Sequence, residues 1–239
     1  MSTILTNTAR PASVTLQYFF WQHPEWWSAV LSALAWTAVL LHTRQHAGHG
    51  SFAQEFAYWV LMVAAMMLPK VMYPVRVTAA SSLWARRHRA ITGFLAGYFS
   101  PWVVLGIVAA ALREGTWAHT YAAPALGFAG AAVWQQTPIH RRALLACHLR
   151  LPLAPTGWTA DRDCLRFGCT IGAACVRSCW PLMLACAFAG HSLIAMMGGT
   201  IVGAVEQRWF RPPTPAVPVG TLAIATYYLV LAALDPGLV

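Results

Sequence analysis

Charged residues are scarce in this chain, and carboxylates are the scarcest of them. Only 7 of the 239 residues are Asp or Glu, and charged residues together make up 10%. No two carboxylates share an apolar run, and neither a phosphate-binding loop nor a Ser/His/Asp set is visible. These are the usual groups for acid–base, nucleotide and hydrolytic chemistry. We therefore expect no enzyme acting alone.

Strict alternation of apolar and polar residues is also missing, which argues against a membrane barrel. Instead, 58% of the residues are hydrophobic, and apolar runs near 20 residues recur, each able to span about 30 Å of hydrocarbon. Lipid offers the backbone no water to bond, so such spans must be helices. The sequence predicts an all-α, polytopic transmembrane helical bundle of six to seven spans. The expected spans are roughly 26–41, 52–73, 91–112, 117–136, 164–186, 192–205 and 219–234.

Two segments follow from this pattern, and no internal repeat is visible. Residues 1–22 are polar and end in the aromatic cluster Tyr18 to Trp21, which is typical of an N-terminal interfacial segment. Residues 23–239 are expected to form a single transmembrane domain. Pro69 and Pro74 predict a kink or an exit in the second span.

The basic residues predict the orientation of the chain. The 16 Lys and Arg against 7 Asp and Glu lie mainly in loops, which favours membrane orientation over nucleic-acid binding. With the N terminus inside, 12 of the 16 fall in cytoplasmic segments. We expect a multi-pass protein of the bacterial cytoplasmic (inner) membrane, with the lipid bilayer and other membrane-protein subunits as its partners.

The stretch 164–186 holds five of the six cysteines and is the most specific signal. On a helix at roughly 100° per residue, four of these cysteines fall within about 60° of one another. Thiolates and thioethers select soft metals such as Cu(I), and zinc is the alternative. Small buried thiols also pack well in helical bundles, so a purely structural role stays open. The candidate metal ligands are Cys175, Cys179, Cys186, Cys164, Met183, Cys147 and Met66.

Other polar groups at or near membrane depth carry weaker signals. His42, His46 and His49 form a loop that either binds a divalent ion or is simply solvated. Arg177 points away from the thiols and needs a partner, for which Glu206 and Glu55 are the available carboxylates. Lys70 is expected to snorkel to the inner interface, and His191 is interpreted as a turn residue.

An ordered set of motifs extends over about residues 55–209: WVLMVAAMMLP, then LAGY with a Trp close behind, WQQTP with a downstream Cys, and C-x3-C-W-x-L-M. In this order they resemble the bacterial family called domain of unknown function 2182, described as predicted metal-binding integral membrane proteins and sometimes labelled copper chaperone. The resemblance implies that Cys175, Cys179 and Cys147 are functional. The chain departs from the family pattern at Ser178 and Ala143, and at Thr170 with Ile171.

Two hypotheses follow. In the first, the chain binds Cu(I) through the thiol and methionine face of its fifth span and acts in metal handling or delivery. In the second, it is a non-catalytic accessory subunit of a larger membrane complex, such as a copper-containing oxygenase or a respiratory assembly. Loss of some family ligands and the 12 tryptophans motivate the second.

Overall fold

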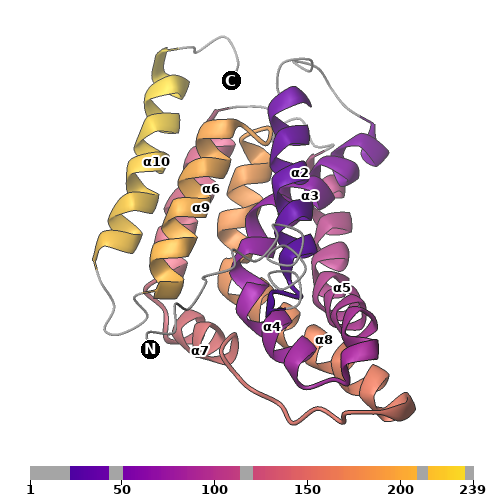
Figure 1. Cartoon of the computed structure of the whole chain (residues 1–239). Helices are drawn as coiled ribbons and strands as arrows, with labels where there is room; N and C mark the ends of the chain where they lie inside the picture. The colour runs from indigo at the N-terminus through magenta and orange to yellow at the C-terminus, as the bar shows by residue number, and fades with distance from the viewer. Residues whose placement is uncertain (1–21, 43–50, 114–120, 209–214, 235–239) are drawn as a thin grey trace, which may run out of the picture.

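The computed structural model describes residues 22–42, 51–113, 121–208 and 215–234. All regular structure in these ranges is helical, as predicted (Figure 1). The interfacial segment, apart from Gln22, and the histidines His46 and His49 lie outside the described residues. The helices are α2 (Trp26–His42), α3 (Phe52–Met67), η1 (Leu68–Val71), α4 (Met72–Ala80), η2 (Trp84–Arg86), α5 (Arg87–Arg113), α6 (Ala122–Trp134), α7 (Pro138–Ala146), α8 (Gly157–Phe188), α9 (Leu193–Arg208) and α10 (Ala216–Leu234).

Four continuous helices in the described ranges are long and apolar enough to cross a membrane, fewer than the six to seven spans predicted. They are Phe52–Ala80, Trp84–Leu112, Gly157–Phe188 and Ala216–Leu234. The other three expected spans are shorter apolar helices, at Trp26–Leu41, Ala122–Trp134 and Leu193–Gln207. The count was too high because these three apolar helices have 10–17 residues, fewer than the roughly 20 that crossing the hydrocarbon requires.

The second span does not end at its prolines. Pro69 opens the short 3-10 segment η1, and the chain then continues as α4 to Ala80. Proline removes one backbone donor and disfavours the regular α-helical bond to the preceding turn, which explains a local 3-10 segment. The segment before the fifth span also contains a helix that the sequence did not predict. Thr137 caps α7 by accepting a hydrogen bond from His140 N at 3.2 Å, with Pro138 at the first helical position.

Helix α8 is the centre of the bundle and packs most extensively on α5. Glycines of α8 allow this close approach. A Cβ added at Gly168 would lie 2.0 Å from Phe94 O, and one at Gly172 would lie 2.4 Å from Tyr98 O. The backbones of α5 and α8 are thus in direct contact, which fixes the position of Tyr98 relative to the thiol face of α8.

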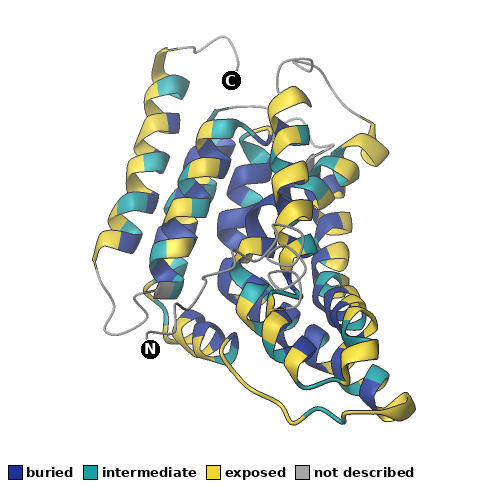
Figure 2. Ribbon diagram, viewed as in Figure 1, coloured by how far each residue is buried: buried dark blue, intermediate teal, exposed yellow. Residues whose placement is uncertain are grey.

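The outer surface of the bundle is strongly apolar. Buried residues face the middle of the bundle, whereas exposed residues cover the outer faces, as α10 at one edge illustrates (Figure 2). Large aliphatic side chains such as Leu126, Val104 and Leu229 are 74%, 65% and 61% exposed. A helical bundle with an apolar exterior is the arrangement that lipid requires, so the fold is consistent with a membrane protein.

Candidate metal centre

The predicted thiol face of α8 is buried along its length. Cys164, Cys175, Cys179 and Cys186 are all at most 6% exposed, and Met183 is fully buried. At about 1.5 Å of rise per residue, however, these positions are spread along the helix. Cys175 and Cys179 are one turn apart, whereas Cys186 lies about 10 Å beyond Cys179 and Cys164 about 16 Å before Cys175. The thiols therefore share a face without forming a single site.

Cys175 is the best-connected thiol of this face. Tyr98 Oη of α5 donates a hydrogen bond to Cys175 Sγ at 3.2 Å, and Cys175 Sγ lies 3.9 Å from Met67 Sδ of α3. Three helices therefore meet at this sulfur atom. The neighbouring thioether comes from Met67 rather than from Met66, the residue that the sequence analysis selected.

Cys147, at the end of α7, joins Cys175 and Cys179. Its thiol interacts with that of Cys175, which also interacts with Cys179. Ser178 lies between them: its Oγ is 3.9 Å from Cys147 Sγ and 3.4 Å from Cys179 Sγ. We call Cys147, Cys175, Cys179 and Met67 the thiol cluster. It joins the three cysteines that the family resemblance selected, although they are up to 32 positions apart in the sequence.

The thiol cluster is compact but not arranged around a metal. In the described part of the chain, no three His, Cys, Asp or Glu side chains are placed as a ready group of metal ligands. Its chemistry nevertheless suits a soft ion, because thiolate and thioether sulfur are the ligands that select Cu(I).

A buried histidine–carboxylate pair adjoins the thiol cluster and was not foreseen. His140 Nε2 lies 2.7 Å from Glu206 Oε1, and its Nδ1 lies 3.0 Å from Ser178 O. Burial lowers the pKa of His140, but the hydrogen bond and charge of Glu206 outweigh this effect, so its pKa is raised above the usual 6.5. Glu206 is therefore paired with His140 and not with Arg177, as the sequence analysis had suggested.

Of the two cations at membrane depth, Arg177 points away from the thiols as expected, whereas Lys70 lies where the sequence analysis did not expect it. Arg177 is exposed, and its Nε donates to Ala173 O of its own helix. Lys70 is half-buried and turned toward α9. A Cβ added at Gly203 of α9 would lie only 2.2 Å from Lys70 Nζ. Lys70 therefore does not snorkel, because the η1 segment directs its side chain toward α9.

The remaining candidates lie away from the thiol cluster. Cys186 Sγ contacts Ala195 O at 3.4 Å, and both Cys186 Sγ and Met66 Cε lie 3.2 Å from a Cβ placed at Gly199. Cys164 is buried against Gly93 at the opposite end of α8. His191 is a turn residue with φ 57°, consistent with its interpretation from the sequence.

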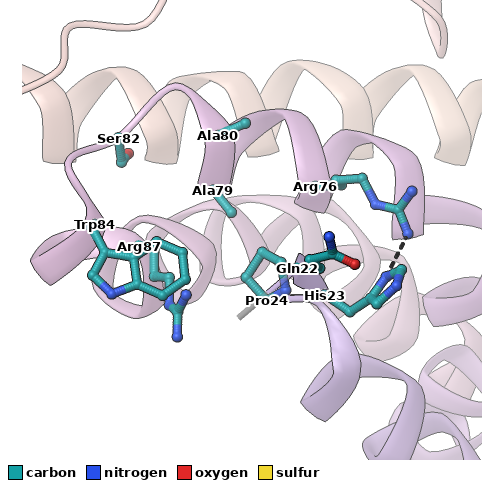
Figure 3. A pocket seen from close by; sticks show the side chains of 9 residues that line it. All are labelled: Gln22, His23, Pro24, Arg76, Ala79, Ala80, Ser82, Trp84 and Arg87. Carbon is teal, nitrogen blue, oxygen red and sulfur yellow. Dashed lines mark hydrogen bonds between the residues drawn. The ribbon is translucent and has the colours of Figure 1, made fainter. Parts of the chain in front are cut away.

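A pocket of about 580 Å³ lies elsewhere, between the segment before α2, the end of α4 and the start of α5 (Figure 3). Arg76 bonds to Glu25 and His23 there, and the Arg87 guanidinium stacks on Trp84 with its Cζ 3.2 Å from the ring centroid. No cysteine or methionine lines this pocket. It is therefore separate from the thiol cluster.

The fold and the thiol cluster together define a helical protein of membrane type with soft-metal donors in its interior. The family model PpoB2, described as a copper chaperone, matches residues 56–230. Since this match covers most of the chain and includes the whole thiol cluster, the protein belongs to this copper chaperone family. No curated protein and no solved structure matches the chain.

Proposed function

We propose that this protein is a membrane copper chaperone that binds Cu(I) through the thiol cluster and passes it to a partner. The observation that carries the proposal is the meeting of Cys175 with Met67 and with two further thiols inside the bundle. Cu(I) favours such sulfur ligands. A buried site would also protect the reduced ion from water and from oxidants.

Within the thiol cluster, we assign the main ligand role to Cys175 and Cys179, which are one helical turn apart on α8. Met67 supplies a thioether from α3, and Cys147 supplies a third thiol from the end of α7. Tyr98 orients Cys175 through its hydrogen bond. Cys186, Met183 and Cys164 are supporting sulfur atoms along the same face of α8, and Met66 of α3 is a fourth; all lie at a distance from this centre.

Metal analysis of the purified protein tests the proposal. The full chain is extracted in mild detergent from copper-supplemented bacteria with its thiols kept reduced. We expect about one copper per chain, with little zinc. Replacing both Cys175 and Cys179 by Ser should remove it. Cys169→Ser is the matched control, since Cys169 lies on α8 but faces Ser100 of α5 at 3.5 Å. Wild-type protein without stoichiometric copper or zinc would refute a metal-binding function.

We also propose that the chain belongs to the group called domain of unknown function 2182. For its orientation, we propose a position in the bacterial cytoplasmic membrane with the N terminus inside. The argument for this orientation is the basic end of the bundle, where Arg86 and Arg89 bond Asp161 at 2.7 and 2.8 Å. Positive residues favour the cytoplasmic side. The test is to fuse to the N terminus a reporter enzyme that is active only outside the cytoplasm. Activity of this reporter would contradict the proposed orientation.

One observation favours a second function, that of a non-catalytic subunit in a larger membrane complex. Arg177 is exposed in the middle of α8, a helix long enough to span the membrane. An unpaired Arg at that depth costs on the order of 3 kcal/mol, which a neighbouring subunit with a carboxylate would offset. Gentle solubilisation followed by mass measurement decides this point. Recovery of a stable monomer would argue against the complex.

A further inference from the structure

The inference concerns the pocket of about 580 Å³ between the end of α4 and the start of α5, and it is independent of the proposed copper function. It depends only on the membrane character of the fold. Of the helices able to cross a membrane, Phe52–Ala80 ends at this pocket and Trp84–Leu112 begins there, since Ala80 and Trp84 both line it. The pocket therefore lies where two spans leave the hydrocarbon, at the depth of the lipid headgroups.

The side chains beside the pocket fit the same depth. Leu83 and Trp84 are 53% and 49% exposed, and the exposed Arg89 follows on the first turn of α5. Tryptophan rings and basic side chains gather at the boundary between hydrocarbon and water. Basic pockets between helices at this boundary are also where proteins recognise the phosphate groups of lipids.

The lining of the pocket is basic. Arg76, Arg87 and His23 line it, and none of the described residues that line it is Asp or Glu (Figure 3). Arg76 is compensated, because its Nε donates to Glu25 Oε1 at 2.8 Å and its Nη2 donates to the same oxygen. Glu25 is buried and does not line the pocket. The net positive charge of the pocket therefore comes from Arg87.

Arg87 keeps a donor that the fold does not use. Its guanidinium stacks on Trp84, with Cζ 3.2 Å from the ring centroid, and its Nε donates to His88 Nε2 at 3.2 Å. Its Nη1 is buried and has no hydrogen-bond partner among the described residues. The nearby carboxylates, Glu25 and Asp161, pair with other arginines. A buried donor without a partner costs free energy, which an oxyanion in the pocket would offset.

We propose that this pocket binds the phosphate group of an anionic ligand, with Arg87 as the main contact and Arg76 as the second cation. A guanidinium group presents parallel N–H donors that match two oxygens of a phosphate. Stacking on Trp84 already holds the Arg87 guanidinium in one orientation. Little side-chain freedom is therefore lost when the ligand binds.

The size and the depth of the pocket distinguish the sources of this phosphate. A volume of about 580 Å³ lies within the range of about 300–1,000 Å³ that is usual for small-molecule sites, so the pocket has room for a headgroup attached to the phosphate. An anionic phospholipid and a free phosphate ion present the same oxyanion. The position at headgroup depth favours the lipid.

Native mass spectrometry of the full chain, purified in detergent and stripped of lipid, tests the inference. The protein is mixed with phosphatidylglycerol, with phosphatidylcholine, whose phosphate is balanced by choline, or with phosphatidylglycerol and inorganic phosphate as competitor. Arg87→Gln and Arg87→Lys are compared with wild type. Arg89→Gln is the matched control, because it removes the same charge from a side chain that bonds Asp161 and does not line the pocket. Thermal unfolding without lipid confirms that each variant is folded.

We expect wild type to retain about one phosphatidylglycerol per chain in preference to phosphatidylcholine. Arg87→Gln should weaken this binding on the order of tenfold, the effect of losing one hydrogen bond to a charged group. Arg87→Lys keeps the charge without the paired donors and should lie between the two, whereas Arg89→Gln should bind as wild type does.

The competitor separates the two sources of phosphate. Lipid that stays bound in inorganic phosphate identifies the headgroup as the ligand, and lipid that is displaced identifies the free ion. The inference is overturned if Arg87→Gln binds as wild type does, or if Arg89→Gln loses as much. Equal binding of the two lipids, or binding of neither lipid nor phosphate, would overturn it as well.

Discussion

The contact between α5 and α8 offers a sharp test of how the thiol cluster is held together. A Cβ at Gly168 would lie 2.0 Å from Phe94 O, whereas ordinary contact begins near 3.4 Å. Gly168→Ala must therefore separate the two backbones locally by about 1.4 Å. Overpacking of this kind costs about 1–3 kcal/mol, and the better helix propensity of Ala returns up to about 1 kcal/mol.

We expect a net loss of about 1–2 kcal/mol, which corresponds to a fall of roughly 2–8 °C in the midpoint of thermal unfolding. Gly130→Ala is the matched control, because nothing lies within 4 Å of a Cβ at that position of α6. This variant should be neutral or slightly stabilised. The assay is thermal unfolding of both variants in one detergent. Equal midpoints for the two would refute the close contact.

Two further predictions concern buried hydrogen bonds. Because Glu206 raises the pKa of His140, their pairing stabilises the fold fully below pH 6.5 and less as pH rises through the higher folded value. Glu206→Gln should therefore lose about 1–3 kcal/mol at pH 6 and progressively less toward pH 9, measured by thermal unfolding; a loss that grows with pH would contradict this. Trp59→Phe removes the bond from Trp59 Nε1 to Trp102 O at 2.9 Å and should cost about 1–3 kcal/mol, measured the same way with the exposed Trp158→Phe as control.

The sequence was informative wherever a single helix decides the outcome. Helical periodicity placed four cysteines on one face of α8 and Arg177 on the opposite side, and in the structure these four cysteines are buried while Arg177 is exposed. The face of a helix on which a residue lies depends only on its spacing from nearby residues, so the sequence pattern predicts it directly.

Distant contacts were beyond the same reasoning. Whether Met66 or Met67 faces Cys175 depends on the rotation of α3 against α8, which no local pattern fixes. Lys70 was expected to snorkel to the interface. The 3-10 segment that contains Pro69 instead turns its side chain toward α9. The pairing of His140 with Glu206 requires α7 to fold back under α8 and α9, and the sequence suggested only a loop in that region.

The distribution of polar groups argues for a function in the interior of this bundle. Packing alone would be satisfied by aliphatic side chains, since buried polar groups are costly unless they are fully paired. Yet Tyr98, His140 and Glu206 come from three different helices and gather around one short stretch of α8. The outer faces, by contrast, carry large aliphatic residues. A purely structural thiol face does not need the histidine–carboxylate pair.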